Sequence, residues 1–546
     1  MAASSFGTLW VTPSPAQRRR GHVAALVCGL AALGLYFATC SRVVEWQDSG
    51  IHQYRILTGQ LEHRWGLALT HPLHFWLGRA ALAVPLGSPE FRLNFLASLW
   101  GAVGVGLLAA TVFALTGRAD AACLGAAVLA VSHSYWQMSA MTETYTLAGA
   151  LLTLEWYLLT HYARTGRPQL LVAIFAANGL HVADHLFGLL SLVTYAVLAL
   201  VRVARGRLRW VWLLGCGLVW AVASAPLWTL VLRYYAQTGS WKATLCSTFF
   251  GGTWAEPGWA AHVLNTRLTG GLVGIAALTL GYNFPSPAMP VALVGFLRSW
   301  RGPARTFRRV LLGQTAIFGV FLGRYPIVDL YTCFVPICLL VALWFGLGAA
   351  RILERSSGRN ARGAWLGVLL LSVVMPVAVY VGFPLVARER LWMRARLRDI
   401  PFREEYTHFF RPWRMVDHSP ADFSRAILDT AGPGGWVLAD PTTAYPVAST
   451  YRLHGGPGGV RIYDVHACIN VPDWPNLSDE ELATFLRAGG RVVVVPGPQE
   501  DKAWTPRFVL DKHDPQFLPF WAIRLPGAGQ TDEHRVDSPP SGDGGP

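Results

Sequence analysis

The chain has 546 residues, of which 53% are hydrophobic and 14% are charged, and its mean hydropathy is +0.34. This composition excludes an ordinary soluble globular protein, which carries more charge. The formal net charge of +14 comes almost entirely from arginine. The arginines cluster in short loops between apolar segments, which is typical of membrane topology signals and not of a nucleic-acid-binding surface. The sequence therefore predicts a membrane protein with no nucleic-acid partner.

Apolar segments long enough to cross a bilayer recur through the first 386 residues. About eleven spans are predicted, at residues 22–41, 94–116, 120–136, 143–162, 168–182, 186–204, 209–231, 267–297, 308–323, 330–350 and 363–386. The first is expected to be retained, since its apolar run is long and no small-x-small signal-peptide cleavage site follows it. The prediction is an all-α polytopic domain over residues 22–386.

The basic residues predict the orientation of these spans. Arg18, Arg19 and Arg20 precede the first span, and arginine-rich flanks tend to stay cytoplasmic. The arm over 1–21 is therefore expected inside. The loop over 42–93 is expected outside, with short helices on the membrane surface. An odd number of spans places the C-terminus outside. The run of arginines that follows residue 387 then also lies outside, against the positive-inside tendency. Either this tendency, which is statistical, does not hold here, or an arginine-rich helix beside the membrane binds lipid phosphates.

The segment 267–297 is the weak point of this topology because it contains Pro285 and Pro287. Two prolines can kink a single span or turn a re-entrant hairpin. Two crossings would move the later arginine clusters to the outer face. A single crossing is preferred for that reason.

From about residue 400 the composition changes to that of a water-soluble domain. Strands are predicted at 434–440, 460–464 and 491–495, with a helix from Ser478 to Leu486 between the last two. Ser478 and Glu481 have the spacing of a capping box. These elements predict a small α/β domain over 387–526 on the outer face, followed by a disordered tail over 527–546.

Under this topology, the polar residues that stand out gather at the outer membrane face. They are Glu45 and Asp48 after the first span, His71 and His74 in the first outer loop, His133, Glu143 and Tyr145 near the fourth span, His181, Asp184 and His185 in the next outer turn, and Arg324, Tyr325, Asp329 and Tyr331 in a later one. A carboxylate as close to a span as Asp48 is costly unless it faces water or does chemistry. One membrane face thus offers acids, histidines, an arginine and aromatic rings together.

Each of these residues also has a structural explanation. Asp48 could mark the membrane interface, and Glu143 could stabilise the start of a helix. His181 and His185 have the i, i+4 spacing of a metal pair, but no third ligand is evident, so a divalent metal is left open and no metal site is predicted. Arg324 could extend to the lipid headgroups.

Glycosyl transfer from a lipid-phosphate sugar would use all of these groups. A carboxylate base would activate an acceptor hydroxyl. Arg324 would stabilise the leaving lipid phosphate, and a groove between spans would hold the lipid tail. The residues expected to bind the sugar and acceptor are His71, Glu143, Tyr145, His181, His185 and Asp329.

The order of short motifs resembles that of a known family. The motifs are Asp48-Ser49-Gly50, His71-Pro72, Arg92-Leu93-Asn94 leading to Ser98, Glu143-Thr144-Tyr145-Thr146-Leu147, and Gly179-Leu180 with His185. They are similar to those of bacterial polytopic proteins of formerly unknown function, whose eukaryotic relatives are protein O-mannosyltransferases of the secretory pathway. The broader class is the GT-C glycosyltransferases. The resemblance covers about residues 20–200 well and the later spans in outline.

The resemblance implies a fold, a reaction and a location. It implies that Asp48 is the first-loop acid and so the candidate base, and that Glu143 and His185 belong to the substrate site. It implies transfer of mannose from a polyprenyl- or dolichyl-phosphate donor to a protein Ser/Thr or glycolipid acceptor, on the periplasmic side of a bacterial inner membrane. The chain departs from the family pattern in two places. Leu73-His74 replaces the usual Pro-Gly, and Ile51 stands where an acid often follows Ser-Gly, so a paired-acid mechanism has less support.

Two other classes of protein compete with this hypothesis. A transporter or lipid flippase would also place polar residues among its spans, but transporters tend to show inverted repeats, and the sequence has no evident internal symmetry. A non-catalytic assembly protein would use the C-terminal domain to bind a partner. Loss of sugar transfer on replacing Asp48 would separate the enzyme from both.

Overall fold

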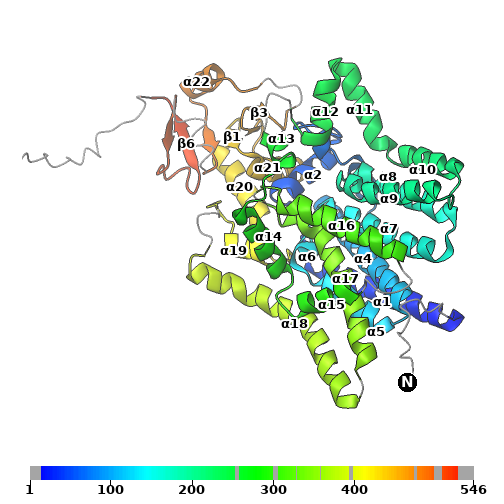
Figure 1. Ribbon diagram of the computed structural model, residues 1–546. Coiled ribbons are helices and arrows are strands. Elements are labelled where there is room, and N and C mark those ends of the chain that lie inside the picture. The colour runs from blue at the N-terminus through cyan, green and yellow to red at the C-terminus, as the bar shows by residue number, and fades with distance from the viewer. Residues whose placement is uncertain are drawn as a thin grey trace, which may run out of the picture. The chain divides into compact units, whose positions relative to one another are not determined.

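A computed structural model describes residues 14–252, 258–298, 305–327, 329–356, 358–392, 398–471, 476–496 and 507–526 (Figure 1). The chain divides into two compact units. The first comprises Met1–Leu397 and Glu404–His418, and the second comprises Arg398–Arg403 and Ser419–Pro546. The helical unit therefore extends beyond residue 386, where the sequence placed its end. The tail predicted over 527–546 lies outside the described residues.

The regular elements of the first unit are all helices among its described residues. Its first half contains α1 (Pro15–Thr39), α2 (Gln47–Thr58), the 3-10 helix η1 (Leu67–Leu69), α3 (Pro72–Leu82), α4 (Pro89–Thr116), α5 (Ala119–Ala130), α6 (His133–Ser139), α7 (Tyr145–Thr165), α8 (Pro168–Asp184) and α9 (Phe187–Ala204). The rest comprises α10 (Trp210–Ala223), α11 (Ala225–Thr238), α12 (Trp241–Phe250), α13 (Gly258–Val263), α14 (Gly270–Asn283), α15 (Ala288–Arg298), α16 (Arg305–Gly323), η2 (Thr332–Phe334), α17 (Val335–Arg355), α18 (Arg359–Glu389) and α19 (Glu405–Phe410).

Sequence signals at the helix ends account for these boundaries. A capping box of Ser14 and Gln17 begins α1, and the Ser88 hydroxyl accepts from the Phe91 backbone N–H at the start of α4. Gly117 ends α4 in the left-handed conformation, which costs glycine little. The predicted outer loop contains short helices, as expected, namely α2, η1 and α3.

Five helices among the described residues are long and apolar enough to cross a membrane: α1, α4, α9, α17 together with η2, and α18. The pair α10 and α11 would be a sixth, but it is bent by 69°. The other predicted spans correspond to helices that fall short of these criteria. The span expected at 120–136 is divided into α5 and α6, and 267–297 into α14 and α15, with the break beside Pro285. A crossing takes about 20 helical residues, and neither α14 nor α15 is that long. The number of crossings at 267–297 therefore stays a prediction.

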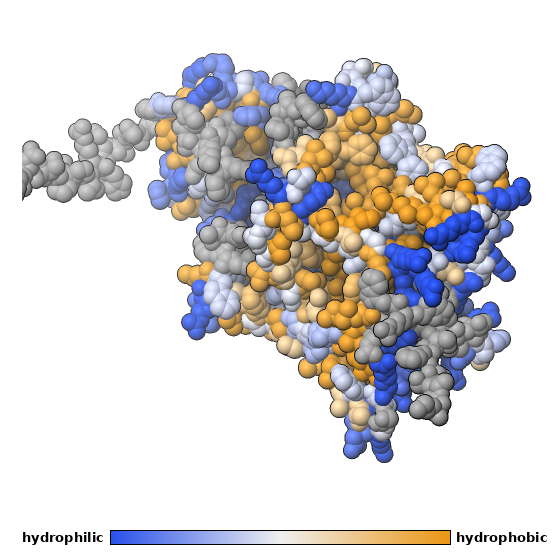
Figure 2. All heavy atoms as spheres, viewed as in Figure 1, coloured by the Kyte–Doolittle hydropathy of each residue, from blue (hydrophilic) through white to orange (hydrophobic). Residues whose placement is uncertain are grey.

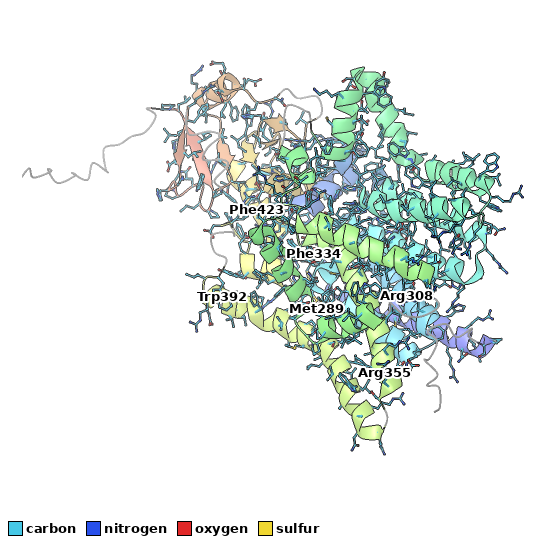
Figure 3. All side chains as sticks on the ribbon, viewed as in Figure 1. Met289, Arg308, Phe334, Arg355, Trp392 and Phe423 are labelled. Atoms are coloured by element: carbon cyan, nitrogen blue, oxygen red, sulfur yellow. The ribbon has the colours of Figure 1, made fainter. Side chains whose placement is uncertain are left out.

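The core of the unit lies around α17, whose residues are almost all buried. This helix packs against α4, α5, α7 and α15. Small residues bring the backbones close: a Cβ added at Gly348 of α17 would collide with the Val291 backbone of α15. Phe334 and Met289 are among the side chains that fill the space between these helices (Figure 3).

The outer helices expose apolar side chains. Most of α1 and α18 is unburied although both are strongly apolar. Figure 2 shows apolar side chains over much of the visible face of the helical unit. Such a surface is stable in lipid and not in water. The chain is an integral membrane protein, as the sequence predicted.

The second unit contains a six-stranded sheet with the order β3-β2-β1-β4-β6-β5. The strands are β1 (Trp436–Ala439), β2 (Arg461–Asp464), β3 (Ala467–Cys468), β4 (Val492–Val494), β5 (Val509–Asp511) and β6 (Trp521–Arg524). β1 pairs in parallel with β2 and β4, and the other pairs are antiparallel. The helices are α20 (Ser419–Ala431), α21 (Pro441–His454) and α22 (Asp479–Arg487). The predicted capping box begins α22, and the three predicted strands are confirmed as β1, β2 and β4.

Candidate active site

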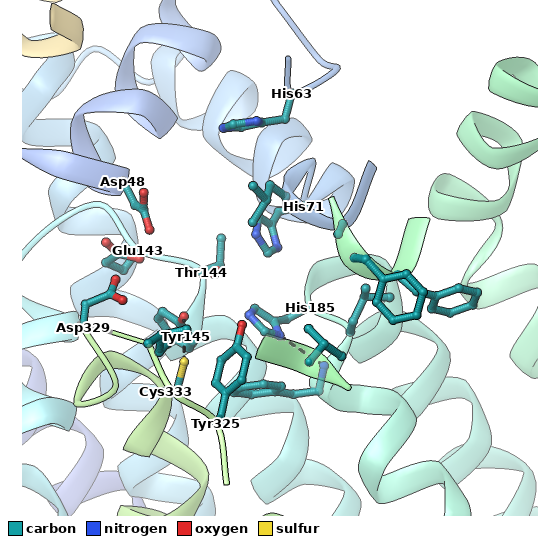
Figure 4. A pocket seen from close by; sticks show the side chains of 18 of the residues that line it. Asp48, His63, His71, Glu143, Thr144, Tyr145, His185, Tyr325, Asp329 and Cys333 are labelled. Carbon is teal, nitrogen blue, oxygen red and sulfur yellow. Dashed lines mark hydrogen bonds between the residues drawn. The ribbon is translucent and has the colours of Figure 1, made fainter. Parts of the chain in front are cut away.

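A cavity of about 380 Å³ lies within the helical unit, where several of the predicted outer connections converge. Its volume is within the range of small-molecule sites. The lining residues are Asp48, Ile51, His52, His63, Trp65, Ala68, Leu69, His71, Glu143, Thr144, Tyr145, His185, Leu186, Phe187, Leu189, Leu190, Phe249, Phe250, Val263, Phe321, Tyr325, Ile327, Asp329 and Cys333. Figure 4 shows many of these side chains directed into the same space.

Three carboxylates form one side of the cavity: Asp48 of α2, Glu143 before α7, and Asp329 before η2 (Figure 4). The same three residues border a second cavity of about 20 Å³. The Ser49 hydroxyl donates to Oε1 of Glu143 at 2.8 Å, which joins the first outer loop to the start of α7. The side chains of three distant segments therefore meet at this end.

The electrostatic environment of Asp48 suits proton transfer. Its side chain is accessible from the cavity, but protein atoms surround the cavity on most sides and limit the water around the carboxylate. This desolvation, and then the charge of Asp329, raise the pKa of Asp48 to about 7. Burial also raises the pKa of the Asp329 carboxyl above its usual range. A carboxylate with a pKa near neutrality can take a proton from a hydroxyl and release it again.

Asn94 of α4 holds the segment that carries Asp48. Its buried side-chain oxygen accepts from Thr142 Oγ1 at 2.6 Å, from the Thr142 backbone N–H at 3.0 Å, and from Gln53 Nε2 at 2.9 Å. Its Nδ2 donates to the Val43 carbonyl at 3.0 Å and the Ser41 carbonyl at 3.3 Å. Asn94 thus ties the residues on both sides of Asp48 to the residue beside Glu143.

Histidine rings face the carboxylates. His71 and His185 stack with their ring centroids 5.1 Å apart, and Tyr145 lies 5.1 Å from the His185 ring. His52 packs edge-on against His71, at 5.4 Å. In Figure 4, His63, His71 and His185 follow one another along the side of the cavity opposite Asp48, Glu143 and Asp329.

The rest of the lining is apolar. It consists mainly of Leu186, Phe187, Leu189, Leu190, Phe249, Phe250, Val263, Phe321 and Ile327. These residues come from α9 and the residue before it, α12, α13, α16 and the segment after α16. The cavity therefore combines an acidic end, a row of histidines and an apolar wall.

Six of the residues predicted from the sequence line this cavity together: Asp48, His71, Glu143, Tyr145, His185 and Asp329. His181 does not line it. Its Nδ1 lies 3.0 Å from Oε1 of Glu155, and both side chains are buried in the helical core. The i, i+4 relation with His185 is lost because α8 ends at Asp184, and His185 has an extended backbone. Among the described residues, no group of three or more His, Cys, Asp or Glu side chains could hold a metal ion.

Arg324 is also absent from the cavity lining. Its guanidinium donates to the Val263 carbonyl at 2.9 Å and to the Asn265 carbonyl. The Asn265 side chain donates in turn to the Arg324 carbonyl. Arg324 therefore fastens the segment that carries Val263, and its role at the lipid phosphate stays a prediction.

Three titratable lining residues were missed from the sequence: His52, His63 and Cys333. His52 could have been found, because it lies four residues after Asp48 and so on the same face of a helix. Nothing in the local pattern singles out His63 or Cys333.

The fold of the chain can be compared with those of solved protein structures. The structure is similar to the crystal structure of ArnT from Cupriavidus metallidurans bound to undecaprenyl phosphate, with a TM-score of 0.56 and 13% identity. It is also similar to the crystal structure of that protein in the apo state, with a TM-score of 0.54 and 15% identity. Each comparison covers 91% of this chain and 97% of the other. The predicted fold class is confirmed: a GT-C-like helical membrane unit followed by a small α/β unit.

The sequence comparisons are more specific. Residues 60–207 match the family model of the protein O-mannosyl-transferase TMEM260 N-terminal domain. Protein O-mannosyl-transferase TMEM260 of Mus musculus is 34% identical over 131 residues, which is 23% of this chain and 17% of that protein. This part of the chain is thus similar to protein O-mannosyl-transferases, as its motifs indicated, and the fold of the chain is GT-C-like. The family match contains His71, Glu143, Tyr145 and His185, whereas Asp48 and Asp329 lie outside it.

Proposed function

We propose that the chain is a glycosyltransferase that moves a sugar, with mannose the first candidate, from a polyprenyl- or dolichyl-phosphate donor to a hydroxyl acceptor. A protein Ser/Thr is the leading acceptor, and a glycolipid is the alternative. The reaction would take place at the outer face of the membrane, which is the periplasmic side in a bacterial inner membrane. No metal or other cofactor is assigned.

The observation that carries this proposal is the combination of chemical groups that line one cavity. An apolar wall suits a polyprenyl chain, the histidines suit a phosphate and sugar hydroxyls, and the carboxylates suit an acceptor hydroxyl. These groups match what a lipid, its phosphate, its sugar and the attacking hydroxyl each need. The undecaprenyl phosphate named for the ArnT structure supports the same class of donor.

The proposed reaction is a single displacement at the sugar. The Asp48 carboxylate takes the proton of the acceptor hydroxyl, whose oxygen forms a bond to the anomeric carbon. The bond from that carbon to the phosphate oxygen breaks, and the lipid phosphate leaves with the electron pair. Ser49 holds Glu143 beside the reacting groups, where its carboxylate can bind sugar hydroxyls.

An Asp48→Asn variant tests this proposal. We expect transfer of radiolabelled mannose from polyprenyl-phosphate mannose to membrane proteins to fall by about 100-fold to 10,000-fold, the range for loss of a general base. Asp120→Asn is the matched control, because Asp120 pairs with Arg118 at the start of α5 and does not line either cavity.

Lipid translocation between leaflets is measured in vesicles reconstituted with the same wild-type and variant proteins. Sugar transfer that survives in Asp48→Asn would contradict the role of the base. A wild-type protein that moves lipid between leaflets without transferring sugar would favour the flippase alternative instead.

A further inference from the structure

The cavity raises a question about the donor phosphate. Among its described lining residues there is no lysine and no arginine. Phosphate groups are usually held by such cations or by convergent N–H donors. The groups that could take this role are the ring nitrogens of His63, His71 and His185, which lie along one side of the cavity (Figure 4).

Backbone hydrogen bonds fix the tautomer of two of these rings. The Phe187 backbone N–H donates to Nδ1 of His185 at 3.1 Å. The Trp65 backbone N–H donates to Nδ1 of His63 at 3.1 Å. A backbone N–H can only donate, so each Nδ1 carries no proton, and each neutral ring has its proton on Nε2. His63 and His185 therefore keep an N–H group for a ligand.

His71 has the opposite tautomer. Its Nδ1 lies 2.6 Å from the Asp184 backbone carbonyl. A carbonyl can only accept, so Nδ1 is the donor and Nε2 of the neutral ring is an acceptor. The ring stacks on His185 with an interplanar angle of 27°. A donor ring and an acceptor ring thus lie in contact.

Burial keeps the unliganded rings neutral. It lowers the pKa of His71 to about 4 and the pKa values of His63 and His185 well below their usual range. The assignment of tautomers therefore holds at neutral pH.

Building on the proposed function, we propose that these rings form the subsite for the phosphate and the adjoining sugar of a polyprenyl monophosphate-linked hexose. Nε2–H of His185 and of His63 donates to the phosphate oxygens, which can only accept when ionised. Nε2 of His71 accepts from a hydroxyl of the sugar. No bond to phosphorus forms or breaks in this subsite.

Substitutions that keep only one ring nitrogen test this assignment. Asn places a polar group near the Nδ1 position and Gln places one near Nε2. His185→Asn keeps an acceptor for the Phe187 N–H and removes the donor to the cavity. His185→Gln keeps a donor at the cavity and removes the acceptor for Phe187. A ring that only supports the loop would show the reverse order of damage.

The measurement is equilibrium binding of radiolabelled polyprenyl phosphate and of polyprenyl-phosphate mannose to the purified full-length chain in detergent. We expect His185→Asn to weaken the binding of both lipids by about 10-fold to 100-fold, as for loss of a hydrogen bond to a charged group. His185→Gln should stay within about threefold of the wild type, because its cavity donor remains.

His71→Asn is a second, independent arm. It keeps a donor for the Asp184 carbonyl and loses the acceptor. We expect it to leave the affinity for polyprenyl phosphate within about threefold and to weaken the mannose-linked donor by about 10-fold. His161→Asn, on α7 and outside the cavity lining, is the matched control.

The outcomes separate this subsite from the proposed function. If His185→Gln loses as much affinity as His185→Asn, or if His71→Asn affects both lipids equally, the subsite is wrong even where the wild type transfers sugar. If the affinities follow the predicted order while the wild type transfers no sugar, the subsite stands and the proposed function fails.

Discussion

Replacing Asn94 tests whether the hydrogen-bond network positions the candidate base. Asn94→Ala removes a fully buried side chain that makes four hydrogen bonds of 3.0 Å or shorter, to Thr142 twice, to Gln53 and to Val43. At about 1 kcal/mol for each bond, the free energy of unfolding should fall by about 4 kcal/mol.

The same change should reduce activity in the molecules that remain folded. The loop before Asp48 loses its hydrogen bond from Asn94 to the Val43 carbonyl. Thr142, which lies beside Glu143, loses its hydrogen bonds to Asn94 as well. A displacement of about 1 Å at a reacting group costs about 100-fold in rate. We therefore expect kcat/KM for mannose transfer to fall by about 100-fold while Asp48 itself is unchanged.

The assay combines a thermal melting curve with transfer kinetics, normalised to folded protein. Asn283→Ala is the matched control. Asn283 is equally buried, and its side chain bonds Ser134, Thr279 and Cys338, away from the cavity lining. It should lower stability without a comparable loss of kcat/KM. If Asn94→Ala loses stability and keeps wild-type kcat/KM, the positioning argument is refuted.

Two further predictions concern Asp329 and Arg324. Since Asp48 acts as a carboxylate, kcat/KM should rise with pH through about 7. Asp329→Asn should shift this rise to lower pH, because the charge of Asp329 helps to raise the pKa of Asp48. An unshifted pH profile would show that Asp329 does not influence the base. Arg324→Gln should leave the affinity for polyprenyl phosphate within about threefold and lower the free energy of unfolding by about 1–3 kcal/mol, because the side chain bonds backbone carbonyls. A tenfold loss of affinity with an unchanged melting curve would show instead that Arg324 binds the phosphate.

The sequence by itself determined the helical membrane class, most helix locations and several residues of the cavity. Hydropathy and helix caps are local properties, so α1 and α4 could be placed without knowledge of their neighbours. Asp48, His71, Glu143 and His185 could be found because they stand in polar connections between long apolar segments and follow a recognisable motif order.

Only the tertiary structure decided how these residues pair. The motif at Ile51 weakened the case for two acids in the first loop, yet Asp329, from a distant segment, borders the same cavity as Asp48. The i, i+4 spacing predicted that His181 and His185 share one helix face, but α8 ends between them. His181 instead lies within hydrogen-bond distance of Glu155. Arg324 carries a charge suited to phosphate, but its Nη1 donates to the backbone carbonyls of Val263 and Asn265, and the residue does not line the cavity.

The physical reason is that a side chain's partner depends on where its helix ends and on what packs opposite. Hydrogen bonds act over about 3 Å and require particular directions. Because α8 ends at Asp184, His185 leaves the helix and lines the cavity, whereas His181 stays in the helical core. Residue type and spacing therefore predicted which chemistry was present, and the packing of distant segments decided which groups face one another.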